Sequence, residues 1–541
     1  MNLVIDPWIP VVTIGGKPHF ANLMQVFTEG EKYADLSVRP HERVALMRLL
    51  ICIAQSALDG PVGKDDWKAT PKKLPESARK YLDKWNKEEV FELFHKEKPF
   101  LQIAVLKPTV KDSKDEKEDK KLKIKQKTEK VETFTSLSKL DISLATGANS
   151  TLLDHQASAT EKRVLDDQQI ALGLITYLNF SASGRIGVAL WNSVESPGKG
   201  ASFPAPGIDK LMVHCFLRGK NLLHSICQNI LTKPVIERHF GKKDAWGKPI
   251  WESFPKGFDD EKAIQNATDT YLGRLVPLSR AIKIRKQEND LLLANGLRYP
   301  LSEDGMYETS ATLKVRDNKR VVLKVNSNAI WRELHAITVR KSDNNSLASG
   351  PRALENLTDE NFDVWCGGIE WTTKGGYINS MESVYNVSSK MLRDECRAIY
   401  QNEVAHAEHI SSNLGWAMEE YRKNIDGYWN TRSDPKKNKN AFKEKDLLHS
   451  KATRSYWTAI EKQRHLLMAY VDLFDVDEKY QAAQKVWRGA IHKAAREAYI
   501  TACGKETPRE IRAFALGWKK LFMEKKPETE NEDQNSDGGE E

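Results

Sequence analysis

The chain has 541 residues, 40% hydrophobic and 29% charged, which is typical of a globular protein with a sizeable core. It contains no stretch of about 18 uncharged apolar residues, so we expect no transmembrane helix, and its first residues, MNLVIDPWIP, do not resemble a signal peptide. The six cysteines are scattered without a CxxC pair. This pattern predicts buried free thiols in a reducing cytoplasm, with no disulfide framework and no zinc site.

The net charge of +8 understates how basic most of the chain is. The final residues 528–541 carry seven acids and no base, so the rest of the chain carries +15. A basic body favours a polyanionic partner such as nucleic acid, although a well-solvated surface explains the same excess. We predict that the acidic tail, 526–541, is disordered.

The first elements along the chain read as a β-hairpin. Residues 3–6 (LVID) and 11–14 (VVTI) are short β-branched runs. Gly15-Gly16 follows the second run and can turn the chain into 17–20 (KPHF). We therefore predict strands over these runs, joined by tight turns.

A helix and then an insertion are predicted next. Residues 41–58 form a helical pattern that is apolar over most of its surface, so this helix is predicted to be buried. Residues 111–130 hold nine lysines, six acids and no aromatic side chain. Such a segment cannot bury enough apolar area to offset chain entropy, and we predict a disordered insertion. A solvated loop and a nucleic-acid contact are both compatible with it.

The middle of the chain, 137–380, mixes short strands and helices. Within it, 311–325 alternates apolar and polar residues around Asp317-Asn318, which predicts a hairpin. The mixture indicates an α+β domain over 1–380 but does not give its topology.

The C-terminal part is predicted to be helical. Thr507, Pro508 and Glu510 form a capping box at the start of the last helix. Four helices of this length favour an antiparallel four-helix bundle over 387–525, with a domain boundary at 380–387. The predicted helices cover 388–422, 446–473, 478–502 and 508–523.

Enzymatic functions receive little support from the motifs. SPGKGASF, 196–203, is not a nucleotide phosphate loop, because Lys199 lies between its glycines. Its glycines suit close approach of the backbone to a ligand or a groove, or a surface turn. Two weak alternatives remain for a hydrolase: Asp154-His155, which lacks a readable nucleophile, and His406 with His409, which lack further metal ligands.

Two stretches suit binding better. On a strand, Lys283 and Arg285 share a face and would present paired donors to phosphates, or form the solvated side of a half-buried strand. Gly367-Gly368 and Gly375-Gly376 bracket IEWTTK, which predicts a bent loop that either enters a groove or closes a hairpin.

Eight motifs, in this order, resemble the large subunit (CasA-type) of the type I-E CRISPR Cascade complex. The resemblance runs from residue 1 to about 525 and omits the insertion 111–130. The motifs are MNLVIDPWIPV at 1–11, PFLQI at 99–103, NSTLLDHQ at 149–156, FLRGKNL at 216–222, KPIWE at 248–252, RLVPLSRAI at 274–282, IWREL at 330–334 and RSYWTAIE at 454–461.

The resemblance implies a non-catalytic, cytoplasmic subunit without a cofactor or metal. Members of this family pair a large α/β domain with a four-helix bundle, inspect duplex DNA for a protospacer-adjacent motif, assist R-loop formation and recruit a helicase-nuclease. The implied partners are crRNA, target double-stranded DNA and other Cascade subunits. A basic scaffold that binds RNA or protein without reading duplex DNA is the alternative.

The resemblance also implies four sets of site residues. The minor-groove glycine loop corresponds to Gly198, Lys199, Gly200, Ala201 and Ser202. The wedge loop, here without the family's glutamine, corresponds to Trp371, Thr372, Thr373, Lys374 and Gly375. The basic finger corresponds to Lys283, Arg285 and Lys286. The crRNA-handle loop corresponds to Thr151, Leu152, Leu153, Asp154, His155 and Gln156. For the displaced-strand track in the C-terminal bundle we expect Lys436, Lys437, Lys439, Arg454 and Arg464, with a solvated basic face as the alternative for each of them.

Overall fold

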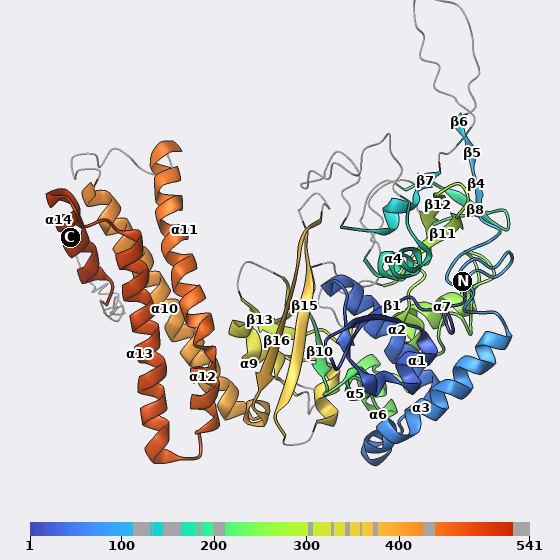
Figure 1. Cartoon of the computed structure of the whole chain (residues 1–541), viewed down its shortest axis with the longest axis horizontal. Coiled ribbons are helices and arrows are strands. Elements are labelled where there is room, and N and C mark those ends of the chain that lie inside the picture. The colour runs from blue at the N-terminus through green and yellow to red at the C-terminus, as the bar shows by residue number, and fades with distance from the viewer. Residues whose placement is uncertain are drawn as a thin grey trace, which may run out of the picture. The chain divides into compact units, whose positions relative to one another are not determined.

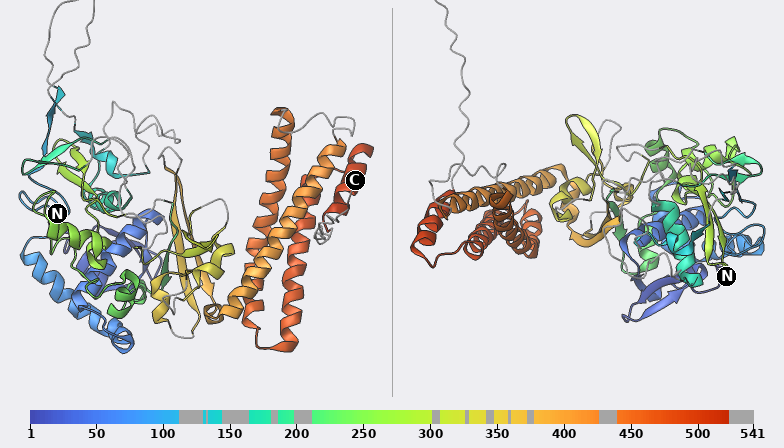
Figure 2. Two further views of the ribbon diagram at one scale, coloured as in Figure 1. Left: turned by 180° about the vertical axis from the view of Figure 1, so that it is seen from behind. Right: turned by 90° about the horizontal axis from the view of Figure 1, so that it is seen from above.

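The computed structural model divides into two compact units, Met1–Asp394 and Glu395–Glu541, which are described separately (Figures 1 and 2). Strands and helices mix in the first unit, whereas the described part of the second contains only helices. The described residues are 1–111, 130–131, 134–143, 164–180, 186–197, 211–300, 307–325, 329–340, 347–357, 360–371, 377–425 and 439–522. No helix within these ranges is long and apolar enough to span a membrane.

The N-terminal sheet has the strand order β2-β1-β3, with bounds Ile9–Thr13 for β1, Pro18–Ala21 for β2 and Tyr33–Leu36 for β3. The predicted turn at Gly15-Gly16 joins β1 to β2, but the predicted strand over 3–6 is wrong. The Asn2 side chain accepts a hydrogen bond from the Val4 amide at 2.9 Å, and the Asn2 carbonyl accepts one from the Asp6 amide at 2.8 Å. These local bonds fold the segment into turns in place of a ladder.

Helix α2, Pro40–Leu58, is buried along nearly its whole length, as the sequence predicts. The helix places Arg48 in the core, where it donates to the Glu308 carboxylate of a distant segment. The two side chains are only 4% and 7% exposed. The other α-helices of this unit are α1 Leu23–Thr28, α3 Lys64–Lys87, α4 Asp167–Phe180, α5 Leu222–Gln228, α6 Lys233–Phe240, α7 Glu261–Asp269, α8 Tyr271–Leu275 and α9 Leu334–Ile337. The 3-10 helices are η1 Gly30–Lys32, η2 Leu137–Leu140, η3 Ile330–Glu333, η4 Arg352–Asn356 and η5 Ser389–Leu392.

Two small sheets pack on a common core. One has the order β4-β8-β9, with bounds Lys107–Pro108, Ala189–Trp191 and Val194–Glu195. The other has the order β11-β12-β7, with bounds Arg280–Arg285, Asp290–Asn295 and Thr135–Ser136. A two-residue ladder, β5 Val110–Lys111 with β6 Lys130–Val131, pairs the two ends of the insertion. Residues 112–129 between them lie outside the described ranges.

A third sheet, β10-β15-β16, is built from His214–Arg218, Phe362–Trp371 and Tyr377–Val387. Beside it, β13 Leu313–Arg316 and β14 Lys319–Val322 form the predicted hairpin. Asp317 and Asn318 at its turn both have positive φ, which suits a two-residue turn of this kind.

The second unit contains helices α10 Asp394–Ile425, whose first residue closes the first unit, α11 Lys439–Lys462, α12 Arg464–Asp472, α13 Asp477–Ala502 and α14 Pro508–Lys520. The predicted single helix over 446–473 is interrupted at Gln463, which separates α11 from α12. Thr507 and Glu510 form the predicted capping box. The Tyr456 hydroxyl donates to the Ala407 carbonyl at 2.7 Å and ties α11 to α10.

The six cysteines are free thiols, and all of them are buried. Cys215 and Cys366 face each other across β10 and β15, with their sulfur atoms 3.5 Å apart. The predicted pattern of buried free thiols is therefore confirmed.

Candidate nucleic-acid interface

The stem of the predicted glycine loop is held by β8 and β9. Ala189 and Ser196 bond twice: the Ser196 amide donates to the Ala189 carbonyl at 2.8 Å, and the Ala189 amide donates to the Ser196 hydroxyl at 3.3 Å. The glycine loop itself, Gly198–Ser202, lies outside the described residues. The structure therefore fixes the point at which the loop leaves the sheet, which is the buried Ser196.

The basic finger lies on β11 and just beyond it, and two of its three cations already have acidic partners. Arg285 donates two hydrogen bonds to Asp290, at 2.8 and 2.6 Å, and its guanidinium lies 3.5 Å from the centre of the Phe134 ring. Lys286 forms an ion pair with Asp167 at 2.6 Å. Lys283 and Arg285 share a strand face as predicted, because they are two residues apart on a strand of regular register. Lys283 pairs with Leu292 and Arg285 with Asp290.

One hydrophobic cluster joins the stem of the glycine loop to the finger strand. Ala189 and Trp191 of β8 pack in it with side chains of the other sheet and of the segment before β4. The remaining buried members are Ile103, Leu106, Ala281, Leu292 and Ala294. Because cores are close-packed, the stem and β11 are held in a fixed relation.

The wedge loop closes the longest hairpin, β15–β16. Trp371 is the last residue of β15 and follows a register shift at Glu370, whereas Thr372, Thr373, Lys374 and Gly375 lie outside the described residues. The expectation that Gly367-Gly368 opens a bent loop is wrong, since both lie in regular register within β15.

These two glycines instead allow close packing. A Cβ on Gly367 would come within 2.4 Å of the Trp365 ring, and one on Gly368 would come within 2.6 Å of the Met212 carbonyl. Trp365 anchors the hairpin further: its indole donates to Glu382 at 2.8 Å, and Arg43 lies 5.1 Å above its ring. The base of the hairpin is therefore rigid.

The handle loop, Thr151–Gln156, lies outside the described residues. So do Lys436 and Lys437 of the predicted displaced-strand track, while Lys439 is the first residue of α11. Arg464 begins α12 and donates to the Glu461 carbonyl at 3.3 Å. Arg454 is the member of the track that lies on the exposed face of α11.

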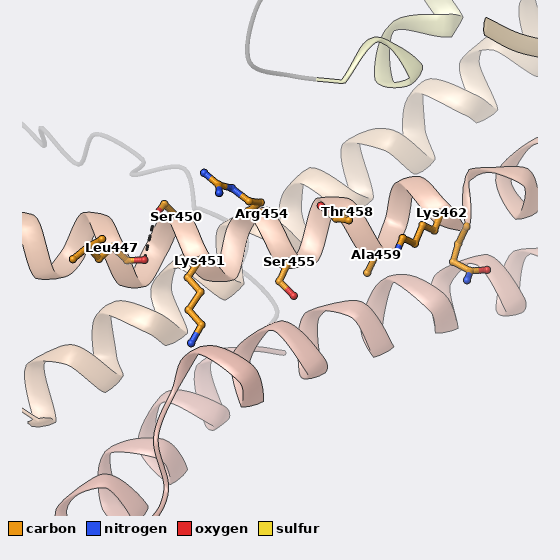
Figure 3. A pocket seen from close by; sticks show the side chains of 9 residues that line it. Leu447, Ser450, Lys451, Arg454, Ser455, Thr458, Ala459 and Lys462 are labelled. Atoms are coloured by element: carbon orange, nitrogen blue, oxygen red, sulfur yellow. Dashed lines mark hydrogen bonds between the residues drawn. The ribbon is translucent and has the colours of Figure 1, made fainter. Parts of the chain in front are cut away.

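The exposed face of α11 (the α11 face) adds residues that the sequence analysis missed. It borders an open pocket of about 890 Å³ (Figure 3). Figure 3 shows Ser450, Arg454 and Thr458 along one edge of this face, and Lys451 and Ser455 along its other edge. The lining residues are Leu447, Ser450, Lys451, Arg454, Ser455, Thr458, Ala459, Lys462 and Gln463. In the sequence, these residues could have been recognised by a cation or a hydroxyl on each helical turn of this face, with no acid among them.

The residues of the hydrolase alternative do not form a site in the described part of the chain. His406 lies in α10 beside His492, with ring centres 5.8 Å apart, and near Glu403, whose carboxylate accepts hydrogen bonds from both Nε and Nη2 of Arg488. Burial, and then the charge of Arg488, lower the pKa of His406. No group of three potential metal ligands occurs among the described residues, and Asp154-His155 lies outside them.

The comparisons first place this chain among CRISPR-associated proteins. A family model described as CRISPR-associated protein Cse1 matches residues 2–498. The chain belongs to the Cse1 family. This result confirms the resemblance to the CasA-type large subunit of type I-E Cascade.

Individual relatives are distant in sequence. The CasA/Cse1 protein of Thermus thermophilus is 24% identical over 522 residues, covering 92% of this chain and 91% of the relative. The crystal structure of Cse1 from Acidimicrobium ferrooxidans matches with a TM-score of 0.69 at 15% identity, covering 96% of each chain. A chain of a CRISPR RNA-guided surveillance complex matches with a TM-score of 0.67 at 16% identity, covering 97% of this chain and 99% of that one. The fold is therefore shared along nearly the whole length.

Proposed function

We propose that this chain is the target-recognition subunit of a crRNA-guided type I-E Cascade. In this role the glycine loop lies in the minor groove of duplex DNA and reads the protospacer-adjacent motif. Bare backbone can approach base edges there, and the degenerate pattern of the minor groove suits permissive reading. The observation that supports the proposal most is the shared core, which sets the stem of the glycine loop and the finger strand on one rigid support.

The wedge loop is proposed to assist opening of the duplex. Unstacking a base step costs a few kcal/mol, so a wedge must be held firmly to act. The packing of Trp365 against Gly367 and its bond to Glu382 supply a rigid base for β15–β16. The displaced strand would then follow the α11 face, whose cations and hydroxyls suit phosphate contacts.

The remaining parts of the proposal follow from the family. The helices of the second unit would act as an antiparallel four-helix bundle, the handle loop would contact crRNA and a neighbouring Cascade subunit, and the assembled complex would recruit a helicase-nuclease. Similarity to a chain of a CRISPR RNA-guided surveillance complex supports the partnership with RNA and other subunits. We propose no catalytic step for this chain and a cytoplasmic location, which the free buried thiols support.

The decisive experiment is binding of the assembled complex to a duplex library randomised beside a matched protospacer. We expect enrichment of a short motif. In the complex carrying Gly200→Phe, the enrichment should flatten while crRNA assembly stays intact, because a large side chain would hold the backbone away from the groove. Gly489→Ala, on an open stretch of α13, is a matched control that should keep the enrichment. Uniform binding of the library by the unmodified complex would contradict motif reading.

The ion pairs of the finger favour the scaffold alternative. Arg285 and Lys286 are engaged by Asp290 and Asp167, so they contribute less to a phosphate site than their sequence pattern indicates. A scaffold that never reads duplex DNA would assemble with crRNA normally. It would bind a non-target duplex as well with the motif as without it. The library experiment therefore separates the two functions.

A further inference from the structure

The α11 face brings three exposed cations together on one side of a helix. Lys451, Arg454 and Lys462 line its open pocket. Within the described part of the second unit, none of the three forms a hydrogen bond or an ion pair. Lys451 and Arg454 lie one helical turn apart, where like charges repel one another and destabilise the helix. An anionic segment bound to this face would offset that repulsion.

The spacing of these cations suits an extended polyanion better than a small ion. Lys451 and Lys462 lie at the two ends of the row, about 16 Å apart along the helix at 1.5 Å per residue. The hydroxyl-bearing residues Ser455 and Thr458 lie between them and line the same pocket of about 890 Å³. A small anion contacts only one or two of these groups at a time, whereas a chain of carboxylates is long enough to contact all of them.

The chain itself carries such a polyanion just beyond α14. Residues 528–541 contain seven acids, no base and no hydrophobic residue. A segment of this composition has no apolar area to add to a core, so its carboxylates are the groups by which it can bind elsewhere. Its charge is opposite to that of the α11 face.

The last described residue, Phe522, sets where this segment starts. The Phe522 ring lies 5.2 Å from the His492 ring and 5.1 Å from the Arg496 guanidinium, both on α13. Helix α13 packs against α11, and the axes of packed helices are about 10 Å apart. Residues 523–527 span up to about 17 Å and residues 528–541 a further 46 Å or so, at about 3.3 Å per residue. The acids can therefore reach the α11 face and extend along it.

We propose that the acidic tail, 526–541, docks on the α11 face of the same chain. A short tether presents a segment to its site at an effective concentration in the millimolar range, so a weak electrostatic contact is sufficient. One consequence rests on the proposed function: the tail competes with single-stranded nucleic acid for the α11 face. Weakly bound polyanions are then excluded from the face, whereas a strand displaced from a duplex on the same complex also competes at high local concentration.

Zero-length crosslinking of the full chain tests the docking without nucleic acid. A carbodiimide joins a carboxylate to a lysine amine only where the two are in contact. We expect peptides that link the acidic tail to Lys451 and Lys462 in preference to Lys479 and Lys485, which are exposed lysines of α13. The links should be lost near 1 M salt, where the Debye length is about 3 Å. An even spread of links over the exposed lysines would overturn the docking.

Fluorescence anisotropy with a labelled oligothymidylate tests the competition. Deleting 528–541 should raise the affinity of the chain for the probe about tenfold at low salt. This is the gain expected when a segment at an effective concentration of about 1 mM competes with a Kd of about 0.1 mM. The gain should disappear near 1 M salt, because screening releases the tail. No gain at low salt would overturn the competition.

The same deletion in a face variant separates docking from a general effect of net charge. Lys451→Ala, Arg454→Ala and Lys462→Ala combined remove the proposed site of the tail. We therefore expect deletion of 528–541 to change the affinity of this face variant less than twofold. A gain as large as in the unmodified chain would show that the acids act through net charge, and would overturn the docking.

A matched control removes two lysines and one arginine elsewhere in the second unit. It combines Lys479→Ala and Lys485→Ala on α13 with Arg512→Ala on α14, all at exposed positions. This control should keep both the crosslinks and the tenfold gain, and its thermal melting should match that of the face variant. Failure of the proposed function looks different. The links to Lys451 and Lys462 would remain, but the face variant would bind the probe as tightly as the unmodified chain.

Discussion

The finger strand β11 and the α11 face are both rich in basic residues, but they differ in what surrounds those residues. In the first, Arg285 and Lys286 are bonded to Asp290 and Asp167. In the second, Lys451, Arg454 and Lys462 form no ion pair within the described part of the chain. The number of bases in a sequence segment is therefore a poor guide to a binding surface. The presence of nearby acids decides which cations remain for a ligand.

The largest effect on stability should come from removing a charge whose role is to stabilise the fold. Glu308→Gln leaves the buried Arg48 without its counter-charge, and we expect the free energy of unfolding to fall by about 3 kcal/mol. Urea denaturation measures this loss. A change below about 0.5 kcal/mol would show that the pair is not structural. Such a result would weaken the contrast between charges that are paired within the fold and the cations of the α11 face.

The same pair predicts a pH dependence. Burial alone would raise the pKa of Glu308, but Arg48 and His214 outweigh burial, so the net pKa is lowered in the folded state. The ionised carboxylate therefore stabilises the fold above the ordinary pKa of a glutamate, and this stabilisation is lost as the pH falls through the lowered value. In unfolding measurements across the acidic range, the Glu308→Gln protein should lack this component.

A smaller loss is expected from Gly368→Ala. The new Cβ would meet the Met212 carbonyl at 2.6 Å and the Val325 side chain at 2.7 Å, so either the strand or its neighbour must move. Overpacking of this kind costs about 2 kcal/mol. Thermal unfolding tests it, with Gly489→Ala on α13 as the control, because nothing lies within 4 Å of a Cβ there. Equal stability of the two variants would contradict the close packing.

Arg285→Ala should show that this finger residue supports the fold more than it binds DNA. Its side chain is 32% exposed, so removing the ion pair with Asp290 and the stacking on Phe134 should together reduce the unfolding free energy by about 1 kcal/mol. The salt slope of duplex binding should stay within error of the unmodified complex. A slope reduced by about 0.9 would instead mean that Arg285 binds a phosphate.

The smallest effect on stability for each substitution is expected on the α11 face. Lys451→Ala, Arg454→Ala and Lys462→Ala combined should change the unfolding free energy by about 0.5 kcal/mol or less for each substitution. The slope of single-stranded DNA binding against salt should nevertheless fall by about 2, because each phosphate of a single strand that a cation neutralises contributes about 0.7. Fluorescence anisotropy with a labelled oligonucleotide measures it. An unchanged slope would mean that the displaced strand does not bind along the α11 face.

The sequence predicted best those parts of the fold that are set by local pattern. Helix α2, the turn at Asp317-Asn318 and the capping box at Thr507 follow from periodicity and from turn and capping chemistry. The strand over 3–6 was mispredicted because Asn2 closes hydrogen bonds that a β-propensity pattern does not reveal. The role of Gly367-Gly368 was mispredicted because it depends on the orientation of the Trp365 ring beside Gly367. It also depends on the Met212 carbonyl and the Val325 side chain, which are distant in sequence from Gly368.

For the site, the sequence identified the segments better than their chemistry. The motifs that carry the family resemblance are mostly packing residues: Gln102 donates to the Leu93 carbonyl inside the core, and Trp331 is fully buried. Such residues indicate the fold but not a ligand. The ion pair of Lys286 with Asp167 and the bond from Lys283 to the Leu106 carbonyl join segments far apart along the chain, so only the three-dimensional structure brings them together.

The ladder between β5 and β6 has a consequence for engineering. Because Val110 pairs with Val131 and Lys111 with Lys130, the two ends of the lysine-rich insertion lie side by side. Lengthening a loop between fixed ends costs only about 0.6 kcal/mol for each doubling. A fluorescent domain or an affinity tag spliced between these strands should therefore report on the working complex without disturbing its interior.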